Sequence, residues 1–144
     1  GPYGIGSLQI YVEHDPLSTY FTIRASRIDP LKVMACFDFV ANNADRKANH
    51  CILDTDGKIW GIDHGLTFHQ DLKLRTVIWE FAGQAIPSII LADLAKLDRL
   101  LAASCSMLKE MANFLEPPEM DALCQRVKWL LDEGIFPGLY SHER

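Results

Sequence analysis

The sequence predicts an α+β fold that is mainly α-helical. Apolar residues recur at intervals of three and four over several long segments, which is typical of helices with one buried face. Two short apolar runs flank an Asp-Gly pair, which predicts a tight β-hairpin. The chain has 144 residues, with no internal repeat and no evident linker, so we expect one domain over residues 1–144.

Two segments near the N-terminus suit extended structure. SLQIYVE, at residues 7–13, mixes branched apolar and aromatic side chains before a turn signal, and YFTIRA, at residues 20–25, is a shorter candidate. Asp29 and Pro30 then open a helix over residues 30–41, because aspartate caps a helix and proline suits its first position. Its predicted buried face consists of Leu31, Met34, Phe37, Val40 and Ala41.

A hairpin follows, and the remainder of the chain reads as helices. Residues 51–53 (CIL) and 58–62 (KIWGI) are the expected strands, joined by the DTDG turn at residues 54–57. Further helices are predicted at residues 76–82, 88–104, 108–115 and 118–133, the last ended by Gly134.

Composition excludes some classes of protein. A formal net charge of −5 argues against a surface that coats nucleic acid, which needs a basic face. No apolar run approaches the roughly 20 residues that span a bilayer, and no secretion signal is visible. We therefore expect a cytoplasmic protein with no nucleic-acid partner and no transmembrane segment. The cysteines lack C-x-x-C spacing and should be buried free thiols: Cys36, Cys51, Cys105 and Cys124.

Polar residues gather at both ends of the predicted hairpin, in NADRKANH and DHG. Since a hairpin brings its two ends together, Asp45, either Asn49 or His50, and Asp63 can converge on one spot. Such a set could hold a divalent metal while one carboxylate accepts a proton. Gly65 would let the backbone turn sharply beside Asp63.

The order helix, D-R-x-x-x-[N/H], hairpin, D-x-G resembles the C-terminal lobe of the protein-kinase-like fold. NADRKANHCIL followed by GIDHGLTF is most similar to the phosphatidylinositol 3- and 4-kinase-like superfamily, and to its small bacterial members. GPYGIGSLQIYVE and KLRTVIWEFAG resemble that group too, so the resemblance covers most of residues 1–85. It implies a hinge strand within residues 1–14, a catalytic helix, loop and hairpin at 29–65, and a helical subdomain at 87–134.

The resemblance implies a phosphotransferase that uses ATP with Mg²⁺ or Mn²⁺ and phosphorylates a hydroxyl of a protein, lipid or small molecule. Asp45 matches the catalytic base, Arg46 the arginine that braces the loop or a phosphate, and Asp63 the aspartate that chelates the metal. His50 stands where the family usually has a metal-binding asparagine, and Asn49 could replace it by a one-residue shift. Imidazole suits manganese or zinc better than magnesium.

Adenine binding is implied for the hinge strand, through backbone groups near Tyr11, Val12 and Glu13. A kinase of this fold also has an N-terminal lobe, with a phosphate-covering loop and a lysine on a strand. The residues before position 7 supply neither. The missing lobe is therefore an expected partner, and this chain alone is expected to be a poor or inactive phosphotransferase.

Two other functions stay open at this point. A pseudokinase or interaction module would keep the scaffold without turnover, which the departure at His50 allows. A metal-dependent hydrolase unrelated to kinases could instead use Asp45, His50, Asp63 and His64. For His64 and His69 themselves, the surroundings predict solvated or backbone-bonded side chains.

Overall fold

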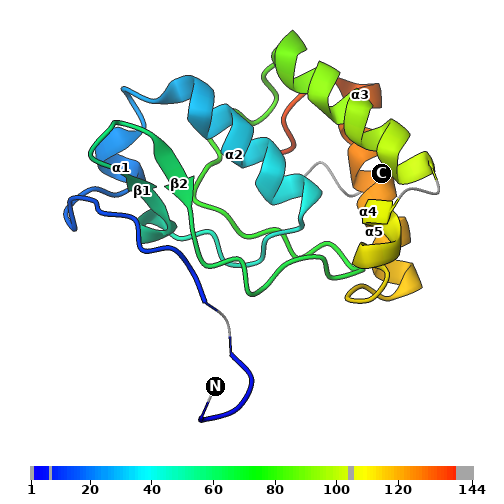
Figure 1. Ribbon diagram of the computed structural model, residues 1–144. Helices are drawn as coiled ribbons and strands as arrows, with labels where there is room; N and C mark the ends of the chain where they lie inside the picture. The colour runs from blue at the N-terminus through cyan, green and yellow to red at the C-terminus, as the bar shows by residue number, and fades with distance from the viewer. Residues whose placement is uncertain (1, 7, 104–105, 139–144) are drawn as a thin grey trace.

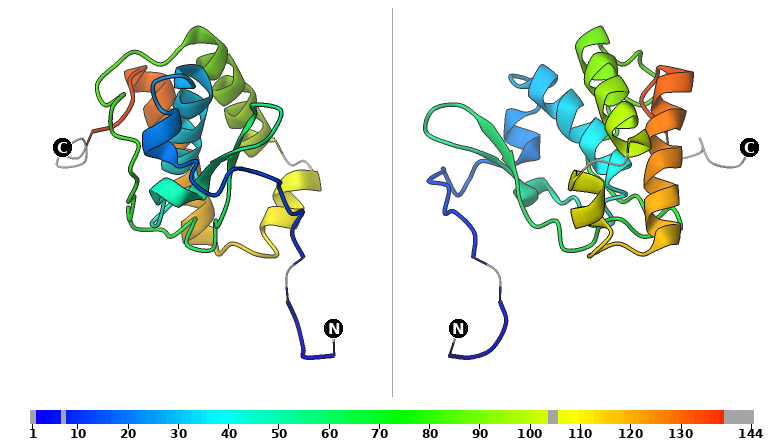
Figure 2. Two further views of the ribbon diagram at one scale, coloured as in Figure 1. Left: turned by 90° about the vertical axis from the view of Figure 1, so that its left-hand side faces the viewer. Right: turned by 45° about the vertical axis from the view of Figure 1, so that its right-hand side comes forward.

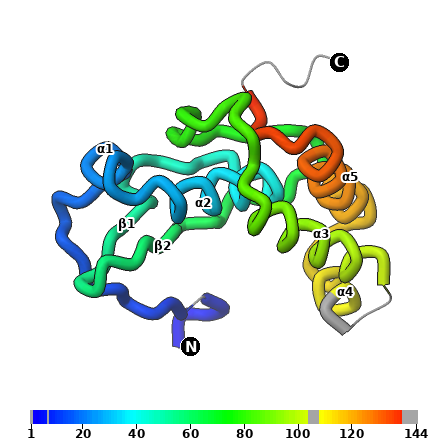
Figure 3. The backbone as a smooth tube through the Cα atoms, turned by 90° about the horizontal axis from the view of Figure 1, so that it is seen from above, coloured from blue at the N-terminus to red at the C-terminus, as the bar shows by residue number. Residues whose placement is uncertain are grey.

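The computed structural model describes residues 2–6, 8–103 and 106–138 of the chain (Figure 1). Within these ranges, five α-helices, one 3₁₀ turn and a two-stranded antiparallel sheet are formed. The hairpin lies on one side of the central helix α2, and the C-terminal helices lie on the other side (Figures 1 and 3). The general prediction of a mainly helical α+β fold is confirmed.

Helix α2 (Ile28–Val40) agrees with the prediction for residues 30–41 to within two residues, but its cap position is Arg27, so Asp29 and Pro30 lie inside the first turn and Asp29 is not the predicted cap. Its burial differs from the single face expected, because the helix contacts both the hairpin and α5. Phe37 is 42% exposed and packs edge-on against His64, whereas the neighbouring Asp38 is fully buried. The side chains of α2 that are buried are Leu31, Met34, Cys36, Asp38 and Phe39.

Asn42 ends α2 and fixes the loop that later returns to it. Its φ of +52° lies in the left-handed region, which asparagine tolerates better than most residues. The buried side-chain amide donates to the carbonyls of His69 and Asp71, each at 2.8 Å, and its oxygen accepts from Lys73 N at 2.8 Å. The predicted stop at the Asn-Asn pair is confirmed, and the Asn42 amide pairs with the backbone of the returning loop.

The N-terminal region differs from both extended segments that were predicted. Residues 20–25 contain a short helix instead, α1 (Tyr20–Ile23), which buries Tyr20 and Ile23. The strand predicted at residues 7–13 is wrong over its described part, residues 8–13; Ser7 lies outside the described residues. A strand needs a neighbouring strand to pair its backbone groups. The β-type backbone pairing next to this segment is a single isolated bridge between His14 and Asp54. The chain before this segment runs away from the body of the molecule (Figures 1 and 2), whereas residues 9–12 lie against the hairpin beside Ile52 and Ile62.

The hairpin forms as predicted. Strand β1 (Cys51–Leu53) pairs with β2 (Ile59–Gly61) in an antiparallel register that sets Ile52 opposite Trp60. Asp54 organises the turn, since its carboxylate accepts from the backbone of Asp56 and Lys58 and from the Trp60 indole at 2.7 Å. The indole hydrogen bond is the main cause that lowers the pKa of Asp54. Both ends of the hairpin are thereby held in a fixed register.

The helix predicted at residues 76–82 is absent, and that segment forms turns. Its backbone pairs with the loop after α2 instead: Arg46 N donates to Arg75 O at 2.9 Å, and Val77 N donates to Arg46 O at 3.2 Å. The Arg75 carbonyl would accept the first hydrogen bond of the predicted helix, and the Arg46 backbone occupies it instead. Apolar spacing alone could not reveal this competition, because Phe81 is buried as a helix would have buried it.

Helices α3 (Ser88–Ala102), α4 (Ser106–Met111) and α5 (Pro117–Glu133) confirm the three C-terminal predictions, with α4 shorter than expected. Helix α3 packs along α5. The main apolar core joins α1, α2, β1 and the loop before α3 to the C-terminal helices. None of the helices in the described ranges combines the length and the apolar character needed to cross a bilayer.

The cysteines of the described residues are free thiols, and Cys105 lies outside those residues. Cys36 and Cys51 are buried as predicted, while Cys124 is half-buried. Burial raises the pKa of Cys36 to about 12 and that of Cys51 to about 11. These two thiols are therefore protonated at neutral pH and serve as packing groups.

Gly134 ends α5 with a left-handed φ of +64°, and its N–H donates to Leu130 O at 3.0 Å. A β-carbon added there would meet no atom within 4 Å, so substitution carries only the backbone penalty. We expect Gly134→Ala to lower the free energy of unfolding by about 1 kcal/mol, measured by urea denaturation. Gly6→Ala, in open space and without positive φ, is the control. Equal effects of the two substitutions would contradict this explanation.

Candidate functional site

Asp45, His50 and Asp63 meet at the base of the hairpin. Asp45 follows α2 in a loop, His50 ends the 3₁₀ turn η1 (Ala48–His50), and Asp63 lies two residues after the end of β2. One ligand atom from each residue lies within 4.8 Å of the other two. The convergence expected from the hairpin is present, and a cluster of two carboxylates and one imidazole can hold a divalent cation.

The His50 ring is buried and has a defined orientation. Its Nδ1 lies 2.8 Å from the Asp45 carbonyl, which can only accept a hydrogen bond, so we assign the proton to Nδ1. A longer contact of 3.4 Å from Lys47 N to the same Nδ1 would need the opposite tautomer and is the weaker of the two. Nε2 then presents its lone pair to Asp63 Oδ2 at 3.3 Å. Histidine ligands of metals commonly have this arrangement, with the other ring nitrogen bonded to a carbonyl.

Asn49 is the alternative ligand that the sequence left open. Its side chain is exposed, whereas His50 is buried and faces Asp63. The geometry favours His50 of the two residues.

Asp63 has a left-handed backbone with φ of +58°. The sharp turn expected at Gly65 occurs here instead, on a residue with a β-carbon, where it carries a cost of about 1–3 kcal/mol. The turn places the largely exposed Asp63 carboxylate against His50 Nε2. Strain of this kind is commonly stored at functional sites.

Asp45 carries a negative charge at the open side of the cluster. Lys47 Nζ lies 2.8 Å from its carboxylate, and this hydrogen bond is the main cause that lowers the pKa of Asp45. Asn43 Oδ1 accepts from the Asp45 backbone N–H at 3.0 Å and so fixes the loop. The Asp45 carboxylate is therefore ionised at neutral pH and able to accept a proton or to bind a cation.

Arg46 lies beneath the cluster and is only 2% exposed. Its guanidinium pairs with the fully buried Asp38 at 2.8 Å. From the other side it donates to the carbonyls of His50 at 3.2 Å and Ile62 at 3.1 Å. Arg46 thus ties together the two chain segments that carry the cluster. Of the two roles expected for it, the contacts support bracing the loop, and burial keeps the side chain from a phosphate in the open site.

His64 is the clearest difference from the predicted site. It is neither simply solvated nor backbone-bonded, because its Nε2 accepts from Arg46 Nη2 at 2.8 Å. Burial of the ring, and then the nearby arginine, lower the pKa of His64. Gly61 permits this contact, since a β-carbon there would lie 3.3 Å from both His64 Nε2 and the guanidinium. His69 does bond to the backbone, by accepting from Asp71 N at 2.9 Å.

Asp38 was missed by the sequence reasoning. The only signal for it is a single acid inside an apolar helical run, ACFDFV. It accepts hydrogen bonds from Arg46, Asn43 and the Thr76 hydroxyl. All of these partners are donors, so the Asp38 carboxylate is the acceptor around which the buried network is built.

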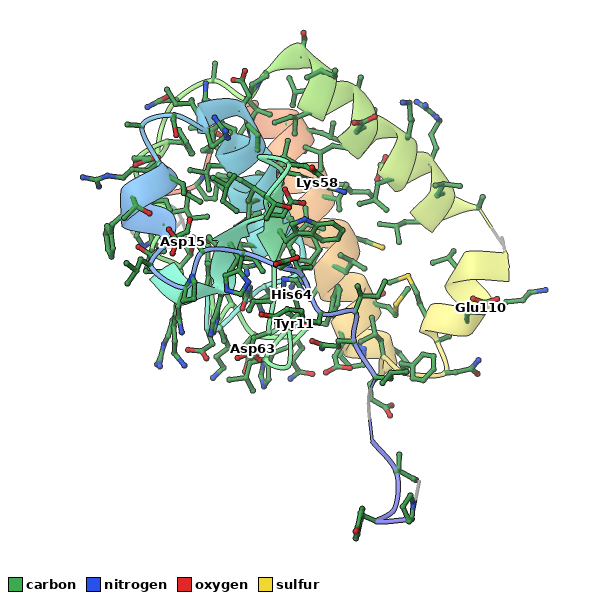
Figure 4. All side chains as sticks on the ribbon, turned by 60° about the vertical axis from the view of Figure 1, so that its left-hand side comes forward. Tyr11, Asp15, Lys58, Asp63, His64 and Glu110 are labelled. Carbon is green, nitrogen blue, oxygen red and sulfur yellow. The ribbon has the colours of Figure 1, made fainter. Side chains whose placement is uncertain are left out.

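An apolar cavity of about 280 Å³ opens beside the cluster. It lies between the N-terminal segment and the hairpin, and Tyr11 and Asp63 both face it (Figure 4). Of the residues predicted to contact adenine, Tyr11 and Val12 line it and Glu13 does not. The Val12 carbonyl already accepts from His14 Nδ1 at 2.7 Å. The lining residues are Gln9, Ile10, Tyr11, Val12, Ile52, Ile62 and Asp63.

The chain is similar to protein Rv2133c of Mycobacterium tuberculosis. The two are 40% identical over 112 residues, which cover 78% of this chain and 40% of the relative. The chain thus spans less than half the length of the curated relative that it matches. No protein-family model matches the chain, and no solved structure matches it significantly. The relative's name states no activity, so these comparisons leave the site's own chemistry to support a function.

Proposed function

We propose that the chain is the catalytic C-terminal lobe of an ATP- and metal-dependent phosphotransferase of the phosphatidylinositol 3- and 4-kinase-like superfamily. One observation carries this proposal: the apolar cavity under the N-terminal segment ends at Asp63, a member of the acidic cluster. An adenine base in the cavity would direct its phosphates toward a bound cation. Phosphoryl transfer needs this combination of positioning and charge neutralisation.

Each residue of the cluster has a role in this proposal. Asp63 and His50 would hold a divalent metal, which would neutralise charge on the phosphates, and the ionised Asp45 would accept the proton of an attacking hydroxyl. Arg46 and Asp38 act as positioning residues beneath them. Adenine packs in the cavity beside Tyr11 and Val12, and the acceptor is a hydroxyl of a protein, lipid or small molecule.

The ligand set favours Mn²⁺ over Mg²⁺. Magnesium prefers six oxygen ligands in near-octahedral geometry, whereas imidazole suits transition metals. His50 contributes a nitrogen, and its tautomer leaves that nitrogen free to bind a cation. We therefore propose Mn²⁺ as the better-bound ion.

Two alternatives are weaker. The hydrolase that would use His64 as a ligand is disfavoured, because that side chain already accepts a hydrogen bond from Arg46. The interaction module or pseudokinase remains the second candidate, and the largely exposed apolar side chains of the N-terminal segment favour it: Tyr3, Ile5, Leu8, Ile10 and Tyr11. Exposed apolar side chains in one segment mark a surface that another body could cover.

Calorimetric titration of ATP into the chain, and into any longer protein that contains it, tests the proposal. We expect binding that requires a divalent ion and is tighter with Mn²⁺ than with Mg²⁺. Asp63→Asn should weaken metal-dependent binding by about 10–100-fold, because a ligand is lost while its shape is kept. Asp56→Asn, in the exposed hairpin turn, should leave binding unchanged. ATP binding that is independent of metal and of Asp63 would contradict the proposal.

A further inference from the structure

Arg126 is a buried cation without a counter-charge. It lies on α5 and is only 6% exposed. Its Nε donates to Val40 O at 2.9 Å, at the end of α2. Nη2 has no hydrogen-bond partner among the described residues, and no carboxylate of those residues forms an ion pair with Arg126. The guanidinium therefore satisfies only part of its hydrogen-bonding capacity.

This arrangement is energetically unfavourable as it stands. Burial lowers the pKa of Arg126, but a guanidinium stays charged at neutral pH. The C-terminal carbonyls of α2 offset part of the free-energy cost of burying this charge, since cations are favoured at helix C-termini. The remaining unpaired donor still carries a desolvation penalty. An anion that accepts from the guanidinium would remove that penalty.

Arg126 is one of the residues that line a cavity of about 280 Å³. Its lining includes the glutamines Gln70 and Gln125, from two separate segments, together with aromatic and aliphatic side chains. None of the residues that line it belongs to the Asp45, His50 and Asp63 cluster, and α5 and the hairpin lie on opposite sides of α2 (Figures 1 and 3). The residues that line it are Phe39, Gln70, Leu72, Ala122, Gln125, Arg126 and Trp129.

We propose that this cavity binds a small organic oxyanion. A carboxylate or phosphate group would accept from the Arg126 fork, which suits planar oxyanions. The two glutamine amides can donate to the same group, and the apolar body of the ligand would pack against Trp129 and Leu72. The cavity is near the small end of ligand sites, which suits a body no larger than one ring. The proposal is independent of the nucleotide site.

Titration of phenylacetate and phenyl phosphate into the chain in metal-free buffer tests this inference. Benzyl alcohol, similar in size but neutral, is the matched ligand. We expect at least one anion to bind about tenfold more tightly than the alcohol, and the tighter of the two identifies the oxyanion class. Arg126→Met should abolish that preference. Lys128→Met, an equal loss of charge at an exposed position of the same helix, should keep it.

Arg126→Met should fold at least as stably as the unmodified chain, because it replaces an unpaired buried charge by an apolar side chain of similar length. If it does not fold, Ala122→Leu fills the cavity and leaves the guanidinium in place; it should then weaken the tighter anion by about tenfold. Anions that bind no better than the alcohol would overturn the proposal. So would equal losses in Arg126→Met and Lys128→Met.

Discussion

Replacement of Asp38 by asparagine is expected to lower the free energy of unfolding by about 3–5 kcal/mol. The carboxylate is fully buried and neutralises Arg46, which is itself buried. Its other partners, the Asn43 amide and the Thr76 hydroxyl, also donate to it. An amide at position 38 would set an N–H₂ group against these donors and leave the guanidinium charge unpaired.

Urea denaturation of Asp38→Asn and Asp29→Asn measures this effect. Asp29 is exposed in the first turn of the same helix, where its charge is worth about 1 kcal/mol or less. A loss at position 38 no larger than that at position 29 would mean that Arg46 finds another partner or reaches water. Metal binding by Asp38→Asn should also weaken, since Arg46 supports the backbone of His50 and Ile62.

The proposed function makes Asp45 the general base, so its replacement by asparagine should lower the rate of γ-phosphate transfer by about 10²–10⁴-fold, the usual contribution of such a base. Asparagine keeps the shape of the side chain but cannot accept the proton of the attacking hydroxyl. The measurement is ATP consumption by the longest protein that contains this chain, with Mn²⁺ present and candidate acceptors added. Affinity for Mn²⁺ and ATP should change by less than about tenfold.

Comparing the change in rate with the change in metal affinity distinguishes two roles of Asp45, general base and metal ligand. A parallel loss of metal affinity would make it a ligand of the cluster instead of the base. Asp56→Asn is the matched control and should keep the full rate. Absence of turnover in the unsubstituted protein, with ATP and metal bound, would favour the pseudokinase or interaction module.

The parts of the fold that the sequence predicted well depend on local signals. Helix α2 has aspartate and proline near its start and asparagines after its end, and the hairpin has its Asp-Gly turn. The predictions for residues 7–13 and 76–82 were wrong, because the structure of these segments depends on partners that are distant in the sequence. A strand exists only where another strand pairs with it, and the second segment pairs with the loop after α2.

The candidate site divides in the same way. Asp45, His50 and Asp63 could be brought together from the sequence because a hairpin fixes how its ends meet. The contacts of Asp38 and His64 could not be predicted, because they depend on where side chains point after packing. Phe37 and Asp38 illustrate this: the apolar residue is exposed and the acid is buried, against the helical pattern. Arg126 is a similar case on α5.

The position of Arg46 also bears on how the site can move. Its guanidinium contacts α2 through Asp38, the turn through His50, and the end of the hairpin through Ile62. Partial opening of any one of these segments would expose a buried charge to water or leave it without its partner. The three segments should therefore unfold together as one cooperative unit. Ligands of the cluster would then stabilise the whole N-terminal half of the molecule. Substitutions that change which ligand binds should therefore be tolerated more easily in the exposed N-terminal segment than in the three segments that Arg46 holds together.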